Sequence, residues 1–413
     1  SKWKFIPFPG QFSVKINSPS EHRGPCHGPT PLPSHAIRRR PRVNDIIDHL
    51  KSLPPSTDLD TILTSCVEMG ASRIHLQTDT SLKIRVHGRN YTVPTMRWTG
   101  REVEDALATM YKSSTGASRL SQAAAIDTSY IIWPDRRKRR YGFRVNAVAT
   151  TIGSNDGIGI VLRPLPEKPT PLEEQYVEPR LVEALEGETG GYLICGVTGS
   201  GKTTLMGGIT RQRLEDPNCH CDIVQGAAPL ELFYDLIEQK NASIQQVEIP
   251  RQLDTFPEFI RAAMREEPTD IEVGECRDPE TMEATIQAII SGHRTTTSVH
   301  TNDPPATIRR VVSLCPASDR DSLAIALVDN LKLIVNQRLL RSTDGKRTAI
   351  RSFLPFNRKI RETLLDAPQA RWPNMVRDFV EQHGQTFEQS IKDVHAQGRI
   401  SDEIAACAMK ELH

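Results

Sequence analysis

A glycine-rich stretch, "GVTGSGKTT" at residues 196–204, constrains the fold of this 413-residue chain more than any other feature. It has the spacing Gly-x-x-x-x-Gly-Lys-Thr, and it lies between a β-like run, "YLIC", and a helical pattern that begins "LMGGIT". This context suits a phosphate-binding loop, because the loop then opens onto a helix N-terminus whose backbone N–H groups can surround a phosphate. The stretch therefore predicts a nucleotide-binding strand–loop–helix unit.

The residues of this loop have distinct expected roles. Glycines permit the tight turn that brings backbone N–H groups around the β-phosphate. Lys202 supplies a point charge to the β- and γ-phosphates, and the hydroxyl of Thr203 can ligate Mg²⁺. A plain glycine-rich turn is the alternative, but it would not need Lys and Thr at these places. We expect ATP and Mg²⁺ to be bound by Gly196, Thr198, Gly199, Ser200, Gly201, Lys202, Thr203 and Thr204.

The rest of the chain divides by its residue patterns. Residues 1–44 are rich in proline and read as a disordered or extended tail, and 164–171 form a proline-rich linker. Between them, 45–163 combine helical patterns with short alternating runs, which predicts an α+β domain. Strand-like and helix-like runs alternate over 172–355, which predicts a parallel sheet with helices on both faces. Residues 356–413 read as polar surface helices.

Composition and charge argue against a nucleic-acid-binding protein and against a membrane-spanning one. Lys plus Arg (52) nearly cancels Asp plus Glu (51), so no overall field favours nucleic acid, and no direct nucleic-acid binding is expected. No apolar run approaches the roughly 18 residues of a membrane span, and no signal-peptide pattern opens the chain. The basic run "DRRKRR" at 135–140 is first read as a solvated hairpin, second as a contact with anionic lipid or a neighbouring subunit, and last as a nucleic-acid site.

The eight cysteines are scattered in a composition typical of the cytosol, which favours reduced thiols. The tight cluster "CHC" at 219–221 lacks the spacing of the common zinc knuckles. We read its two cysteines as small residues of a loop rather than as metal ligands.

Several further segments occur in a characteristic order: "MGASRIHLQ", "FRVNAVA", "GIVLRPLP", "GVTGSGKTT", "APLELFYD", "VGECRDPET", "SGHRTTTSVHTND" and "NQRLLRSTDGKR". In this series the chain resembles the type II/IV secretion and pilus ATPase superfamily (PilT/GspE-like), and within it the DotB-like ATPases and the transfer ATPases of I-type conjugative plasmids. The resemblance covers roughly residues 45–400. It implies an α/β fold, with a RecA-like P-loop ATPase core and a smaller PAS-like α+β N-terminal domain, in subunits that work as ring hexamers.

The resemblance also implies roles for four residues outside the loop. Glu275 matches the family's Walker B glutamate, which positions the Mg²⁺-bound or attacking water, and His300 would sense or orient the γ-phosphate. Arg144 and Arg163 match arginines that reach the phosphates across a domain or subunit boundary. Arginine suits that task because its planar fork pairs with phosphate. Taken singly, the same residues would be read as a solvated glutamate, a structural histidine and two surface arginines.

Two segments depart from the family pattern. "GAAPLELFYD" places Ala227 where the family has a catalytic glutamate, while the second acid of that motif survives as Glu231. Loss of a positioned general base lowers a rate by about 10²–10⁴-fold, so hydrolysis is in question. "TDIEVGE" carries Asp270 and Glu272 in a strand that should be almost wholly apolar. We expect these carboxyl groups to be paired, protonated or at a sheet edge.

These observations give a leading hypothesis and two alternatives. The leading hypothesis is a hexameric ATP-hydrolysing motor of a type IV secretion or conjugative transfer apparatus. It would bind other copies of itself and inner-membrane machinery proteins, as a cytoplasmic protein peripheral to the inner membrane. The first alternative, favoured by Ala227, is an ATP-binding assembly subunit of the same ring that hydrolyses weakly or not at all. A stand-alone P-loop kinase or NTPase is the second, and the long motif series argues against it.

Overall fold

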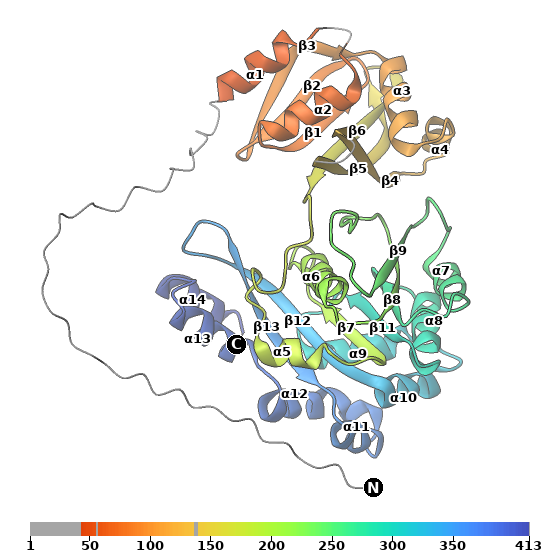
Figure 1. The fold of residues 1–413 in the computed structure, drawn as a ribbon, viewed down its shortest axis with the longest axis vertical. Helices are drawn as coiled ribbons and strands as arrows, with labels where there is room; N and C mark the ends of the chain where they lie inside the picture. Colours follow the sequence, from red (N-terminus) through yellow and green to blue (C-terminus); the bar gives the residue numbers. More distant parts are fainter. Residues whose placement is uncertain (1–42, 55–56, 136–138, 413) are drawn as a thin grey trace, which may run out of the picture. The chain divides into compact units, whose positions relative to one another are not determined.

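The computed structural model describes residues 43–54, 57–135 and 139–412 (Figure 1). The predicted tail lies outside the described residues, except that Val43 and Asn44 already belong to the first helix. The centre of the basic hairpin, 136–138, also lies outside them. Within the described part of the chain, no helix is both long and apolar enough to cross a membrane.

The N-terminal sheet has six strands in the order β3-β2-β1-β6-β5-β4, and each neighbouring pair is antiparallel. Its core follows the alternation seen in the sequence: on β2, Leu82, Ile84 and Val86 are buried on one face. A capping box between Thr99 and Glu102 fixes the start of α3. The elements are α1 (Val43–Ser52), α2 (Leu59–Glu68), β1 (Ala71–Gln77), β2 (Thr80–Val86), β3 (Arg89–Trp98), α3 (Gly100–Tyr111), α4 (Gly116–Ser121), β4 (Ile126–Asp135), β5 (Arg139–Ile152) and β6 (Asn155–Leu165).

The second sheet has seven strands in the order β13-β12-β7-β11-β10-β8-β9. All its neighbouring pairs are parallel except the β12–β13 hairpin. The strands are β7 (Gly190–Cys195), β8 (Asp222–Ala227), β9 (Ser243–Glu248), β10 (Asp270–Val273), β11 (Arg294–Val299), β12 (Leu331–Arg341) and β13 (Arg347–Pro355). Every residue of β7, β10 and β11 is buried, as expected for parallel strands covered on both faces.

Helices cover both faces of this second sheet. On β7, Tyr192 and Ile194 pack with residues of α5 and α6, whereas Leu193 packs in a different cluster with residues of α8, α9 and α10. Because successive side chains of a strand point to opposite faces, the two clusters lie on the two sides of the sheet. The helices are α5 (Pro179–Ala184), α6 (Lys202–Glu215), α7 (Phe256–Ala263), α8 (Pro279–Ile290), α9 (Pro304–Leu314), α10 (Arg320–Asn330), α11 (Arg358–Leu365), α12 (Trp372–His383), α13 (Phe387–Ala396) and α14 (Asp402–Lys410). The predicted α/β fold with a parallel core is confirmed.

The two acidic residues of β10 are both buried, and both have partners. Asp270 forms ion pairs with Arg213 of α6 and Arg294 of β11. Glu272 accepts hydrogen bonds from Thr210 and Gln225, and burial raises the pKa of its carboxyl group. Asp270 is therefore paired, which is one of the expected solutions, and Glu272 has two hydrogen-bond donors in a buried site that disfavours its ionised form.

Candidate nucleotide-binding site

The glycine-rich loop joins the carboxyl end of β7 to the first residue of α6, as the motif predicted. Gly201 is the N-cap of α6, and no side chain caps the helix there. The first turn of α6 also contains no acidic residue. The N–H groups of this helix end, with their partial positive charge, are therefore available to an anionic ligand.

Two glycines of the loop are required by close backbone approaches. At Gly196, a Cβ atom would lie 2.4 Å from the Oγ of Ser200 and 2.5 Å from the carbonyl oxygen of Gln337. At Gly201, where φ is +86°, a Cβ atom would lie 2.7 Å from the Nε2 of Gln337. A Cβ atom at position 196 would collide with the backbone of β12, and at position 201 it would displace the Gln337 side chain in a backbone conformation that other residues rarely adopt, so the loop conformation depends on glycine at both positions.

A buried residue of β12 supports the loop from below. The Nε2 of Gln337 donates a hydrogen bond of 2.8 Å to the carbonyl oxygen of Ser200. Its Oε1 accepts a bond of 2.8 Å from Arg351, which is itself paired with Glu178 at 3.0 Å. Neither Gln337 nor Arg351 could be singled out from the sequence, because their roles depend on contacts with residues more than 100 positions away along the chain.

One cavity of about 660 Å³ brings most of the predicted residues together. Its lining includes Glu275, His300, Arg144, Arg163 and Ala227. From the loop it includes Thr198, Gly199, Gly201, Lys202, Thr203 and Thr204. The other two predicted loop residues, Gly196 and Ser200, do not line the cavity; Ser200 is buried beneath the loop.

Lys202 is held close to the loop that precedes it. Its Nζ donates to the carbonyl oxygens of Gly196 and Val197, at 2.9 and 3.2 Å, and lies 3.4 Å from the Nδ1 of His300. Burial lowers the pKa of Lys202, because desolvation disfavours the ammonium ion. A phosphate group in the cavity would favour the charged form again.

Glu275 and His300 come from neighbouring parallel strands. Glu275 lies two residues beyond the end of β10, and His300 directly follows β11. Carboxyl ends of parallel strands meet at one edge of a sheet. There the Nε2 of His300 lies 2.9 Å from the Oε1 of Glu275. With a carboxylate at Nε2 and the ammonium of Lys202 at Nδ1, the fitting neutral tautomer carries its proton on Nε2.

The two predicted arginines are neighbours on the N-terminal sheet, where Arg144 of β5 pairs in register with Arg163 of β6. The guanidinium of Arg144 donates to Asp127 and to Glu231, each at 2.5 Å. These partners raise the pKa of Arg144, led by the hydrogen bond with Asp127. The charge of Arg144 is thus balanced by two carboxylates in this structure.

The structure places no carboxylate at position 227. Ala227 is the last residue of β8 and lines the cavity, while the carboxylate of Glu231 contacts Arg144. In the sheet register Ala227 pairs with Glu248 of β9. Glu248 is fully buried, receives hydrogen bonds from Thr128 and Ser129, and is absent from the cavity lining.

The cavity suits a Mg²⁺–nucleotide complex. Mg²⁺ in nucleotide sites is held by one or two protein oxygen ligands together with phosphate oxygens and water. The hydroxyl of Thr203 and the carboxylate of Glu275 line the same cavity as the ammonium of Lys202. Thr203 would therefore offer an oxygen ligand to Mg²⁺, Glu275 a carboxylate beside it for a metal-bound or attacking water, and Lys202 a cation for the phosphates.

Comparison with known proteins identifies the family and the fold of the chain. Residues 49–404 match the family described as type II/IV secretion system protein. The chain is 28% identical over 350 residues to the type IV pilus retraction ATPase PilT of Pseudomonas aeruginosa, covering 84% of this chain and 97% of PilT. The crystal structure of the ATPase DotB of Legionella pneumophila superposes with a TM-score of 0.80 at 31% identity, covering 87% of this chain and 98% of DotB.

A structure of the pilus retraction motor PilT with bound ADP superposes with a TM-score of 0.72 at 26% identity, covering 86% of this chain and 97% of that chain. These matches confirm the RecA-like core that the family resemblance implied. The chain belongs to the type II/IV secretion system protein family, among whose members are secretion and pilus ATPases.

Proposed function

We propose that this protein is a hexameric ATP-hydrolysing motor of a type IV secretion or conjugative transfer apparatus. The observation that carries the proposal is the Glu275–His300 pair, which faces Lys202 of the phosphate-binding loop in one cavity. The likeness to DotB and PilT supports the choice of a secretion or pilus motor. In this proposal 45–163 form the PAS-like domain, 164–171 the linker, 172–355 the ATPase core and 356–413 the C-terminal helices.

The proposed position of ATP follows from two adjoining cavities. The phosphates would lie along the loop, where the hydroxyl of Thr203 would hold Mg²⁺ together with phosphate oxygens. A second cavity of about 680 Å³ shares Gly201, Thr204, Leu339 and Arg347 with the first, and we assign the ribose and base to it. In that cavity Tyr176 offers an exposed ring, with the guanidinium of Arg399 4.1 Å from its centre.

Each proposed catalytic residue has one task. Lys202 neutralises charge on the β- and γ-phosphates. Glu275 orients the attacking water. His300 contacts the γ-phosphate and, through its hydrogen bond with Glu275, changes the position of that carboxylate when the γ-phosphate is present. Arg144 and Arg163 supply further positive charge to the phosphates. At Arg144 the phosphates compete for the guanidinium with the carboxylates of Asp127 and Glu231.

A second candidate function rests on Ala227. With no carboxylate at the end of β8, the chain would bind ATP as a structural ligand and serve as an assembly subunit of the ring. The same cavity supports both functions, so ATP binding alone does not distinguish them. The rate of ATP hydrolysis does distinguish them.

The test combines turnover with binding on the full chain. We expect Mg²⁺-dependent ATP hydrolysis by a species whose mass is six times that of the subunit. Glu275→Gln should lower turnover by about 10²–10⁴-fold while a fluorescent ATP analogue still binds. Lys202→Ala should weaken binding itself, whereas Lys359→Ala on the exposed surface of α11 should change neither. Binding without turnover in the unchanged chain would favour the assembly subunit, and absence of binding would refute both functions.

The proposed location is the cytoplasmic face of the inner membrane, where the ring binds proteins of the secretion or conjugation machinery. In cell fractionation the protein should sediment with membranes when that machinery is present and be released by high salt, as expected for peripheral attachment through polar contacts. Release only by detergent would contradict peripheral attachment.

A further inference from the structure

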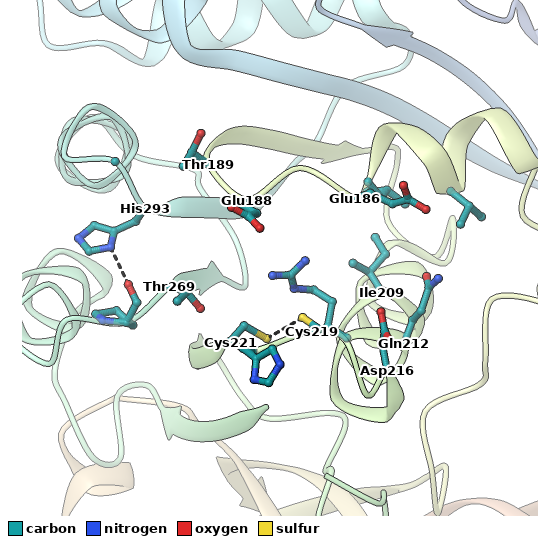
Figure 2. A pocket seen from close by; sticks show the side chains of 16 residues that line it. Glu186, Glu188, Thr189, Ile209, Gln212, Asp216, Cys219, Cys221, Thr269 and His293 are labelled. Atoms are coloured by element: carbon teal, nitrogen blue, oxygen red, sulfur yellow. Dashed lines mark hydrogen bonds between the residues drawn. The ribbon is translucent and has the colours of Figure 1, made fainter. Parts of the chain in front are cut away.

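A second kind of site lies at the opposite edge of the seven-stranded sheet from the phosphate-binding loop. A cavity of about 670 Å³ opens there, lined by residues directly before the starts of four strands: Thr189 before β7, Cys221 before β8, Thr269 before β10 and His293 before β11 (Figure 2). The residues that line it are all different from those that line the nucleotide cavity. The proposed function makes no use of this cavity.

Two thiol groups meet in this cavity. The Sγ atoms of Cys219 and Cys221 lie 3.3 Å apart, and Figure 2 shows their side chains directed at one another. Cys219 is partly exposed in the segment after α6, and Cys221 is buried immediately before β8. A disulfide bond has a sulfur–sulfur length of about 2.0 Å, so the two sulfur atoms must approach one another by about 1.3 Å and adopt the disulfide dihedral angle to form one.

We propose that Cys219 and Cys221 are a modification site, which forms a reversible intramolecular disulfide with low-molecular-weight disulfides as the oxidant. The thiolate of Cys219 attacks one sulfur of the oxidant, whose S–S bond breaks and releases one thiolate. The thiolate of Cys221 then attacks the Sγ of Cys219 in the mixed disulfide and expels the second thiolate. Two electrons pass from the protein to the oxidant, and the two thiol protons end on the two released thiolates.

The environment decides which cysteine reacts first. Cys219 has access to solvent, whereas burial raises the pKa of the Cys221 thiol to about 12, and its hydrogen bond with Cys219 contributes. The guanidinium of Arg213, which also lines the cavity, acts in the opposite direction and favours the thiolate of Cys221. The order is therefore attack by Cys219 and resolution by Cys221.

Two other roles, a metal site and a disulfide that stabilises the fold, explain the cysteine pair less well. Within the described residues, no group of three or more His, Cys, Asp or Glu side chains could hold a metal ion. A disulfide stabilises a fold mainly by closing a long loop in the unfolded chain, and Cys219 and Cys221 are separated by one residue. This bond would change the chemical state of the segment between α6 and β8 and add little stability.

The position of the pair connects it with the nucleotide cavity. α6 begins at Lys202 and β8 ends at Ala227, both in that cavity, while the thiol pair lies at the far ends of the same two elements. The test nevertheless uses the thiols alone, so its result does not depend on ATP turnover.

The experiment treats the full chain with oxidised glutathione, alkylates the remaining thiols and digests it with trypsin. The tryptic peptide 214–240 contains both cysteines of the pair and no other. We expect it to escape alkylation, to weigh about 2 Da less than its reduced form, as two lost hydrogens require, and to return to that form with dithiothreitol. Cys219→Ser and Cys221→Ser should each abolish this product, and Cys407→Ser, at an exposed cysteine elsewhere, should leave it unchanged.

Phenylarsine oxide, which bridges two neighbouring thiols, gives an independent measure of the geometry. It should protect both cysteines of the peptide from alkylation in the folded chain, and either serine variant should lose that protection. The proposal is overturned if the peptide stays doubly alkylated under conditions that modify Cys407. It is equally overturned if glutathione remains on Cys219 without resolution, or if Cys221→Ser still retains the arsenical at Cys219.

Discussion

The Nε2 of His300 and the Oε1 of Glu275 are 2.9 Å apart at the carboxyl edge of the parallel sheet. The pair joins the segments that follow β10 and β11, and the second ring nitrogen of His300 lies 3.4 Å from the Nζ of Lys202. One side chain thus contacts both the proposed water-positioning carboxylate and the proposed phosphate-binding lysine. Binding or loss of a phosphate beside Lys202 can therefore alter the position of Glu275 through the imidazole of His300 alone.

If Glu275 and His300 act as a unit, the effects of substituting them on the activation free energy should not be additive. We expect Glu275→Gln and His300→Gln each to lower kcat by about 10²–10⁴-fold. The kcat of the double variant should be close to that of the less active single variant. The measurement is kcat at saturating Mg²⁺–ATP, with nucleotide affinity as a check on binding. Glu283→Gln, on the exposed surface of α8, is the matched control. Effects that multiply in the double variant would show that the two side chains act independently.

The missing carboxylate at position 227 can be restored. Ala227 lines the nucleotide cavity at the end of β8, so the variant Ala227→Glu would place a carboxylate in the cavity. We expect kcat to rise by about 10-fold or more, because a positioned base contributes 10²–10⁴-fold and the new side chain lacks an evolved setting. Ala227→Gln has the same size without the charge and should leave kcat unchanged. Equal rates for the two variants would mean that catalysis uses no carboxylate at this position.

The sequence was most informative where function depends on local order. The loop at 196–204 could be predicted because the strand, the glycines and the helix are consecutive. The meeting of Glu275 and His300 could also be anticipated from their matching positions after strand-like runs, since parallel strands end at a common edge.

Other features could not be read from the sequence because they depend on contacts between distant segments. Arg144 is paired with Glu231, 87 residues further along the chain, and Gln337 supports a loop that is 137 residues away. Arg294 opens the strand "RTTTSV", yet it is fully buried against the ring of Tyr192. A basic residue in such a run resembles any exposed strand end until its acidic partner in the neighbouring strand is known.

Glu272 should make the stability of the protein depend on pH. The carboxyl group of Glu272 accepts hydrogen bonds from Thr210 at 2.5 Å and from Gln225 at 2.6 Å, but it is buried, and burial disfavours its ionised form more than these bonds favour it. Its pKa is raised from 4.5 by burial. Between about 4.5 and the raised pKa, the unfolded chain loses this proton and the folded chain keeps it, so the contribution of Glu272 to stability falls as pH rises.

The variant Glu272→Gln removes this titration and keeps an oxygen for Thr210. We expect its free energy of unfolding, relative to that of the unchanged chain, to rise from pH 5 to pH 8 in urea titrations. Glu280→Gln, at an exposed position of α8, should show no such trend. A difference between Glu272→Gln and the unchanged chain that is constant across this range would mean that Glu272 is ionised in the folded protein.

Asp270 should be among the most sensitive positions for stability. Its carboxylate lies 3.1 Å from the Nε of Arg213 and 3.5 Å from the Nε of Arg294, and the side chain of Arg294 is only 1% exposed. Burial lowers the pKa of Arg294 because desolvation disfavours its charge, and the carboxylate of Asp270 acts in the opposite direction. Removing one member of a buried pair costs about 3–5 kcal/mol, because the remaining charge is left uncompensated.

The variant Asp270→Asn should therefore lower the free energy of unfolding by about 3 kcal/mol or more at pH 7, since the amide keeps the shape and removes the charge. Asp329→Asn, at an exposed position near the end of α10, should stay within about 0.5 kcal/mol of the unchanged chain. Both are measured by urea unfolding followed by circular dichroism. A loss below about 1 kcal/mol for Asp270→Asn would be the value of an exposed pair, and would show that water reaches Arg294 when Asp270 is neutral.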